Sequence, residues 1–146
     1  MTELVQSGVT GIDEVLGGGF PPNRLYLIEG ESGSGKTTLG LQFLLEGAKN
    51  NEKVLYIGTS ETEEDIRAVA ASHGWPLEGV TLFHHKGERN EPELGQTVIH
   101  PAEIDLPQTM ETILAVVENE KPERLVIDSL TEIRLLAREA HWYWKR

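Results

Sequence analysis

A glycine-rich segment is the strongest chemical signal in this sequence. Residues 30–37 read Gly-Glu-Ser-Gly-Ser-Gly-Lys-Thr and match the pattern G-x-x-x-x-G-K-S/T. Glycines let the backbone bend so that successive N–H groups point into one concavity, which binds phosphate oxygens. In this pattern Lys36 reaches the β- and γ-phosphates of a nucleotide, and the Thr37 hydroxyl is a ligand for Mg²⁺. The segment predicts a phosphate-binding loop (a Walker A motif), and the alternative is a glycine-rich turn without a ligand. The residues predicted to contact the nucleotide are Ser32, Gly33, Ser34, Gly35, Lys36, Thr37 and Thr38.

Two carboxylates at the ends of apolar runs are candidates for metal binding and catalysis. Asp128 follows an apolar run, where a phosphate-loop enzyme places the carboxylate that holds Mg²⁺ through water. Glu61 follows the apolar run of residues 53–59 and is a candidate base for a water that attacks the γ-phosphate. The alternatives are that Asp128 only forms a turn and that Glu61 only belongs to a helix-capping turn. Because ligand sites of parallel sheets lie at the carboxyl ends of the strands, we expect the loop and both carboxylates to face one crevice.

Apolar patterning alternates between strand and helix along the chain. This alternation predicts an α/β fold with a mainly parallel sheet and flanking helices. Four runs have the near-continuous apolar character of strands buried on both faces, at residues 25–29, 53–59, 80–83 and 125–128. Helical periodicity predicts helices that begin near residues 36, 60, 107 and 132.

Several helix ends are predicted from residue type. Ser60 and Glu63 fit a capping box, and Gly74 fits the stop of the helix that follows. Pro107 suits the first position of the next helix. The amide at that position has no hydrogen-bond partner within the helix, so the missing N–H of proline costs no hydrogen bond there. The apolar residues of that helix at i, i+3, i+4 and i+7, which are expected to face the core, are Met110, Ile113, Leu114 and Val117.

Composition excludes several classes of protein. The chain has 146 residues and a formal net charge of −11, which argues against general affinity for nucleic acid because phosphate binding needs cations. No apolar run approaches the roughly 18 residues that a membrane span requires. The N-terminus lacks the pattern of a secretory signal, and the absence of cysteine excludes disulfides and zinc thiolates. We therefore expect a cytoplasmic protein without a membrane anchor.

Three regions carry weaker signals. Residues 84–106 fit no element, and a stretch of this length is functional, mobile, or contains a short strand near residues 97–99. His84, His85 and His100 lack the spacing of a metal site and are interpreted as loop histidines. The aromatic and basic residues 142–146 are interpreted as a disordered end or a docking helix, with contact to a partner or to single-stranded nucleic acid as the alternative.

The motifs in combination resemble the KaiC/RadA branch of RecA-like ATPases, and the likeness to a KaiC-type domain extends over almost the whole chain. The segments that carry it are residues 7–21 (SGVTGIDEVLGGGFP), 30–37, 60–62, 72–75 and 126–129. The resemblance implies ATP as the nucleotide, Mg²⁺ as the metal, and a homo-oligomeric ring, usually a hexamer, with nucleotide between neighbouring subunits. It gives Lys36, Thr37 and Asp128 the roles described above. It also places Ser72 near the adenine, whereas the alternative is a polar residue on a helix surface.

Two departures from the family pattern affect these expectations. KaiC carries two adjacent glutamates at the strand tip, and here Ser60 replaces the first, so hydrolysis is slow or Glu61 takes over the role of base. RecA-like sheets also insert a later strand between the Asp128 (Walker B) strand and the strand before the phosphate loop. We therefore expect residues 1–146 to be the N-terminal part of such a domain, truncated after the Walker B strand. Otherwise two apolar edges remain unpaired, as an aggregation hazard or a surface for a partner.

The leading functional prediction is a Mg²⁺-dependent ATPase, a hydrolase in which Lys36 and backbone amides stabilise charge while a water attacks. One alternative is a nucleotide-binding module that assembles without turnover. Another is an autokinase of the KaiC type, which transfers phosphate to serine or threonine. A homo-oligomer with protein partners is expected, and nucleic acid is not an expected ligand. The same domain would serve clock timing, signalling or motility control.

Overall fold

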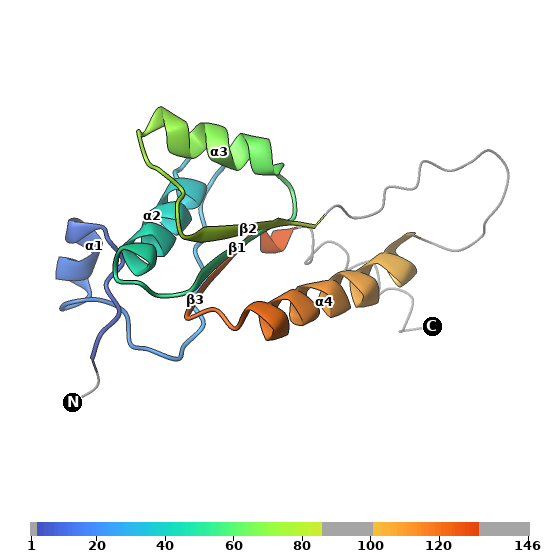
Figure 1. Ribbon diagram of the computed structural model, residues 1–146, viewed down its shortest axis with the longest axis horizontal. Helices are drawn as coiled ribbons and strands as arrows, with labels where there is room; N and C mark the ends of the chain where they lie inside the picture. Colours follow the sequence, from blue (N-terminus) through green and yellow to red (C-terminus); the bar gives the residue numbers. More distant parts are fainter. Residues whose placement is uncertain (1–2, 86–100, 132–146) are drawn as a thin grey trace, which may run out of the picture.

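The described part of the chain is built around a parallel sheet. The computed structural model describes residues 3–85 and 101–131. Three strands, β1 (Val54–Gly58), β2 (Val80–His84) and β3 (Arg124–Asp128), lie in the order β2-β1-β3, and both pairings are parallel (Figure 1). The predicted α/β class and these three strands are confirmed. Since β1 is central, its carboxyl end lies between those of β2 and β3, and residues at all three tips are neighbours.

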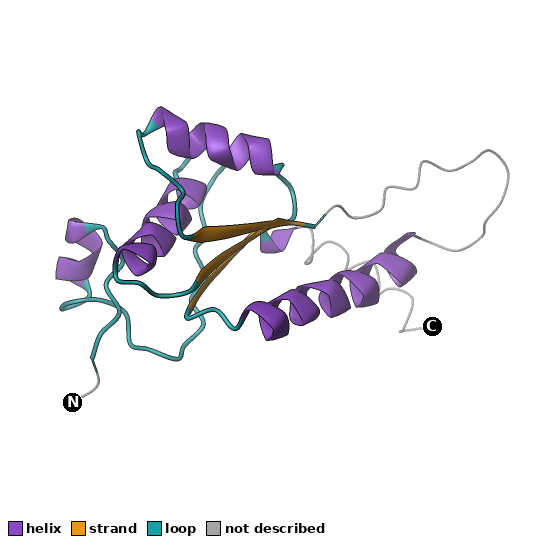
Figure 2. Ribbon diagram, in the orientation of Figure 1, coloured by secondary structure: helices purple, strands orange, loops and turns teal. Residues whose placement is uncertain are grey.

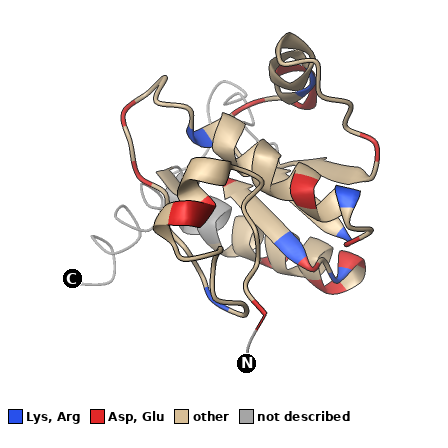
Figure 3. Cartoon of the chain, turned by 90° about the vertical axis from the view of Figure 1, so that its left-hand side faces the viewer, with Lys and Arg blue, Asp and Glu red and all other residues tan. Residues whose placement is uncertain are grey.

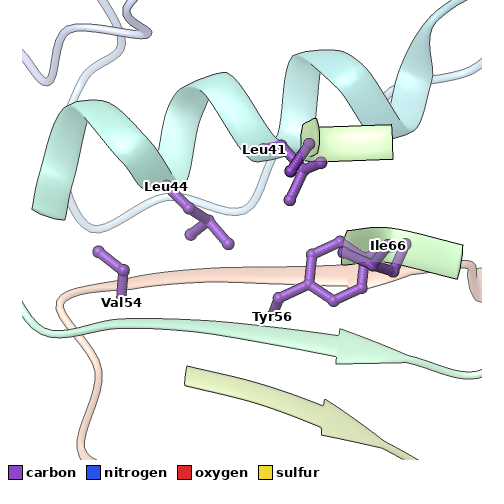
Figure 4. Packing of buried hydrophobic residues seen from close by; sticks show 6 residues of the cluster. Leu41, Leu44, Val54, Tyr56 and Ile66 are labelled. Atoms are coloured by element: carbon purple, nitrogen blue, oxygen red, sulfur yellow. The ribbon is translucent and has the colours of Figure 1, made fainter. Parts of the chain in front are cut away.

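Helices cover both faces of this sheet, as Figure 2 shows. The helices are α1 (Thr10–Val15), α2 (Lys36–Lys49), α3 (Glu63–Ser72) and α4 (Pro101–Glu120). On one face, alternate β1 residues Val54 and Tyr56 pack with Leu41, Leu44 and Ile66 from α2 and α3 (Figure 4). On the other face, Leu55 and Ile57 pack with Ile113 of α4. This alternation follows from the two-residue period of a strand and explains why β1 is apolar throughout.

The predicted strand at residues 25–29 is wrong for the described structure. The segment pairs with no strand, and its apolar side chains are exposed, with Leu25 at 93%. An apolar run becomes a strand only where a neighbouring strand accepts its backbone hydrogen bonds and covers its faces. Within the described residues β3 is an edge strand, so the segment has no neighbour to pair with.

Helix α4 differs from the prediction in its start and its buried face. It begins at Pro101, so Pro107 lies inside the helix rather than at its first position. Ile113 is buried (3% exposed), as predicted, and Val117 packs beside it. Met110 and Leu114 are exposed instead, Leu114 at 54%, because α4 meets only one narrow stripe of the sheet. The buried stripe is completed by a polar residue, Thr109, whose hydroxyl forms a 3.0 Å hydrogen bond with His85 Nε2.

Helix α3 begins two residues later than the Ser60 cap predicted. Its N-cap is Thr62, whose side chain accepts from the Asp65 amide while the Asp65 carboxylate accepts from the Thr62 amide. Residues 59–61 form a bend, and Thr59 ties the strand tip to Ser129 through both a donated and an accepted hydrogen bond. The predicted stop at Gly74 is confirmed, with φ of +71° directly after the cap residue His73.

Some predictions fall on residues that the structure does not describe. These are the short strand near residues 97–99, the helix over residues 132–138, His100, and the tail at residues 142–146. In the described residues no helix is both long and apolar enough to cross a bilayer. Figure 3 shows Lys and Arg interspersed with Asp and Glu in the described part of the chain.

One buried arginine joins the start of β3 to the N-terminal segment. Arg124 is almost fully buried, and its guanidinium donates to Glu52 Oε2 at 2.5 Å and to the carbonyls of Gln6 and Phe43 at 2.6 and 2.9 Å. The same group lies over the Phe43 ring, 4.7 Å from its centre. Gly47 of α2 makes room for it, since a Cβ there would lie 2.6 Å from the arginine side chain. Arg124 therefore holds α2 in register with the sheet and so positions the loop before α2.

Candidate functional site

The loop before α2 has the backbone conformation that its glycines permit. Gly33 and Gly35 have φ of +81° and +96°, a region that other residues rarely adopt, and Gly35 is the N-cap of α2. Lys36 Nζ folds back over the loop and donates to the carbonyls of Gly30 and Glu31 at 2.5 and 2.8 Å. The ammonium therefore lies above the loop at the N-terminus of a helix, where unpaired N–H groups favour an anion.

A threonine of the loop and the distant aspartate meet directly. Thr37 Oγ1 donates to Asp128 Oδ2 at 2.6 Å across 91 residues of sequence. This contact places the start of α2 against the tip of β3, as the sequence predicts. Because the hydroxyl hydrogen points at the carboxylate, the oxygen lone pairs of Thr37 are left for a cation. In the described residues no group of three or more His, Cys, Asp or Glu forms a metal cage. A Mg²⁺ held here would thus take most of its ligands from phosphate and water, as Mg²⁺ commonly does.

Tyr56 is a site residue that sequence reasoning missed. Its hydroxyl donates to the same oxygen, Asp128 Oδ2, also at 2.6 Å. Burial, the hydrogen bond to Asp128 and the charge of Asp128 raise the pKa of the Tyr56 phenol far above its usual value, so it remains a donor. A signal existed in the sequence, because Tyr56 is two residues before Gly58, the β1 residue paired with Asp128. Residues two apart lie on the same face of a strand, but the register of β1 with β3 had to be known first.

Glu61 lies just beyond the tip of β1, near Asp128. Partial desolvation raises the pKa of the Glu61 carboxyl above its usual value, and the negative charges of Asp128 and Asp65 raise it further. Glu61 also borders a small cavity of about 10 Å³, together with residues of β1 and β2 that include Tyr56 and His84. This volume approaches that of a single water molecule. In the described part of the chain the buried His84 Nδ1 has no hydrogen-bond partner, so a polar atom is available at this cavity.

The remaining predicted residues lie at the tip of β1, in α3, and in the loop and first turn of α2. Ser60 is exposed at the strand tip, between Thr59 and Glu61. Ser72 lies at the opposite end of α3 from the strand tips, and its hydroxyl donates to the Val69 carbonyl of the same helix at 2.7 Å. The structure does not bring Ser72 against the loop, so its place near an adenine stays a prediction. Ser32, Gly33, Ser34 and Gly35 form the loop itself, and Thr38 lies in the first turn of α2.

A larger open groove lies away from these residues. Its volume is about 660 Å³, and it is bordered by α1 and the C-terminal end of α2, with Asp13, Glu14 and Glu46 among its lining residues. The three carboxylates outnumber the one cation of the lining, Lys49, which disfavours phosphate, and Lys36 and Thr37 are at the other end of α2. Size therefore does not identify the candidate site, whereas the convergence of Lys36, Thr37, Asp128 and Glu61 does.

The parallel sheet, the glycine-rich loop that opens α2 and the Thr37–Asp128 contact define a phosphate-loop protein of the RecA-like class. Comparison with known proteins makes this assignment specific. The family described as "ATPase: KaiC" matches residues 5–142. The chain therefore belongs to the KaiC ATPase family, whose domain is a RecA-superfamily phosphate-loop ATPase.

Individual relatives agree with this family. The chain is similar to the UPF0273 protein PH0284 of Pyrococcus horikoshii, with 30% identity over 91% of this chain and 57% of the relative. It is also similar to the circadian clock oscillator protein KaiC of Prochlorococcus marinus, with 35% identity over 90% of this chain and 26% of that protein. KaiC of Parasynechococcus marenigrum is 36% identical over the same shares. The chain thus spans little more than half of the first relative and about a quarter of the two clock proteins.

Proposed function

We propose that this protein binds ATP with Mg²⁺ and hydrolyses it. The observation that carries the proposal is the 2.6 Å hydrogen bond between Thr37 and Asp128, which brings the predicted phosphate loop against the predicted metal-binding carboxylate. Membership of the KaiC ATPase family supports the same conclusion. In this proposal the amides of residues 32–38 bind the phosphates, while Thr37 ligates the metal and Asp128 holds it through water.

Each side chain of the site has a role in this reaction. Lys36 leaves the carbonyls of Gly30 and Glu31 and moves its ammonium to the β- and γ-phosphates, where it stabilises the charge that develops. Glu61 orients a water for attack on the γ-phosphate and accepts its proton. The raised pKa of Glu61 makes its carboxylate a stronger base than an ordinary glutamate. When bound, Mg²⁺ neutralises phosphate charge.

A second candidate function is a nucleotide-binding module that hydrolyses ATP slowly or not at all. The observation that favours it is Ser60, which stands where KaiC has its first glutamate and is exposed at the strand tip. A third candidate, transfer of phosphate to serine or threonine of the protein itself, is what the resemblance to KaiC-type proteins implies. Radiolabel from γ-labelled ATP that remains on the protein would favour this third candidate.

Assembly and location belong to the same proposal. We propose a homo-oligomeric ring in the cytoplasm, in which a neighbouring subunit and Ser72 complete the nucleotide site. We also propose that residues 1–146 are the N-terminal part of such a domain, which the exposed apolar segment at residues 25–28 supports. Light scattering during titration with Mg²⁺-ATP measures this assembly, and an unchanged mass at saturating nucleotide contradicts it.

Single-turnover release of phosphate from ATP tests hydrolysis. We expect Glu61→Gln to slow release by about 100-fold or more, the range for loss of a general base, with nucleotide binding unchanged by calorimetry. Glu64→Gln is the matched control, because Glu64 is an exposed glutamate in the first turn of α3 and should release phosphate as the wild type does. Equal, near-zero release by wild type and Glu61→Gln with intact binding would favour the module instead.

The pH profile of ATP hydrolysis distinguishes a catalytic role of Glu61 as a base from a structural role. A base acts as the carboxylate, so the wild-type rate should fall as pH drops through the pKa of Glu61. Because that pKa is raised, the fall should begin at a higher pH than an ordinary glutamate, with its pKa of 4.5, would give. Glu61→Gln should lack this limb of the profile. A limb that persists in Glu61→Gln assigns it to another group.

A further inference from the structure

Asp128 is held by two hydroxyls that come from different elements. Oδ2 accepts hydrogen bonds of 2.6 Å from Thr37 of α2 and from Tyr56 of β1. Hydrogen bonds to an ionised acceptor are short and strong, so both contacts restrict the rotation of the carboxylate. The two donors differ in their proposed roles. Thr37 is itself the proposed metal ligand, whereas Tyr56 approaches from within the sheet and has no other proposed role.

The Tyr56 ring is a rigid support for its hydroxyl. Tyr56 is 1% exposed and packs in the cluster with Leu41 of α2 and Ile66 of α3. Figure 4 shows these side chains. A buried phenol must find an acceptor because water cannot reach it, and Asp128 is the acceptor here. Since packing fixes the ring, the position of Oδ2 is fixed relative to the core of the domain.

We propose that Tyr56 is a positioning residue for the metal site: by holding Oδ2 it fixes the orientation of the Asp128 carboxylate, which would hold Mg²⁺ through water. The inference rests on the proposed function, because it needs a metal–nucleotide complex at this site. It goes beyond the Walker motifs, which do not include a strand tyrosine. Partners that orient a metal-binding carboxylate commonly change metal affinity by 10- to 100-fold when they are removed. Asp128 acts through water, so the lower figure applies.

Removal of the hydroxyl alone tests this role. In the full-length protein, Tyr56→Phe keeps the ring and its packing, and we expect it to weaken Mn²⁺ binding about tenfold in the presence of nucleotide, measured by electron paramagnetic resonance. Affinity for a fluorescent methylanthraniloyl derivative of ATP in EDTA should not change, because the loop and Lys36 supply that binding. Tyr26→Phe is the matched control, since the Tyr26 hydroxyl donates to the Pro21 carbonyl at 2.7 Å, outside the site.

A double substitution shows whether Tyr56 acts through Asp128. Asp128→Asn alone should weaken Mn²⁺ binding, and adding Tyr56→Phe should weaken it no further, because the group that Tyr56 positions has already lost its charge. Additive losses would overturn the inference. In steady-state hydrolysis, Tyr56→Phe should raise the Mg²⁺ concentration for half-maximal rate while saturating Mg²⁺ restores kcat.

The outcomes distinguish this inference from the proposed function. Wild-type protein that binds no nucleotide overturns both. Nucleotide binding with equal Mn²⁺ affinity in wild type and Tyr56→Phe overturns the inference and leaves the proposed function standing. Equal losses of Mn²⁺ and metal-free nucleotide affinity overturn it too, because they show a general structural defect rather than a metal-specific one.

Discussion

Two segments of nearly the same composition differ in burial and in secondary structure. Residues 25–28 read Leu-Tyr-Leu-Ile, and residues 54–57 read Val-Leu-Tyr-Ile. The second segment is the central strand β1, where Leu55 is 1% exposed, whereas Leu25 in the first segment is almost wholly exposed. The difference lies in the neighbours, because β1 has strands on both sides and helices on both faces. An apolar pattern indicates that a segment tends to be buried. Whether it forms a buried strand depends on neighbouring strands and helices that cover it.

The largest expected effect comes from the same substitution in both segments. Leu55→Ala should lower the free energy of unfolding by about 2–5 kcal/mol, because it leaves a cavity between β1 and α4. Leu25→Ala should change it by less than about 0.5 kcal/mol, because the side chain is exposed. Urea denaturation measures both values. Equal losses would break the comparison, since they would show that residues 25–28 are covered in solution.

A second contrast sharpens the comparison with charged residues instead of apolar ones. Arg124→Met should cost about 3 kcal/mol, the lower end for a broken buried ion pair, because its partner Glu52 stays partly hydrated. Arg67→Met removes an ion pair with Glu63 in which both side chains are about half exposed, and it should cost less than about 0.5 kcal/mol. Urea denaturation again measures both. A similar small loss for the two variants would mean that burial of Arg124 adds no stability.

The smallest expected effect concerns the turn that leaves β1. Thr62→Ala should destabilise the protein by about 1 kcal/mol through loss of the α3 cap, while Ser60→Ala should have no effect on α3. The hydrogen bonds from Thr62 lower the pKa of Asp65, so their contribution is present above the ordinary pKa of aspartate and is lost as pH falls through the lowered value. Thr62→Ala should therefore raise the pKa of Asp65 in an NMR titration. A raised pKa in Ser60→Ala instead would support the cap predicted from the sequence.

The sequence was sufficient for the elements with strong local signals. The glycine-rich loop, helix α2 and the three paired strands follow from residue type and periodicity, and the meeting of Thr37 with Asp128 follows from the rule for parallel strand ends. The prediction that a helix begins at Pro107 was wrong, because proline is tolerated at a helix start but does not require one. Tyr56 was missed because its partner is fixed by the register of β1 with β3, which no local pattern encodes.

The strand order has a consequence for how the chain folds during synthesis. Thr59 at the tip of β1 bonds to Ser129, which is made 70 residues later. At a ribosomal rate of about 5–20 residues per second, one side of the nascent central strand stays open for roughly 4–14 seconds. Its Val-Leu-Tyr-Ile stretch is the kind of segment that pairs with other nascent chains. Chaperone contact with the newborn polypeptide should therefore be concentrated in the interval before β3 emerges from the exit tunnel.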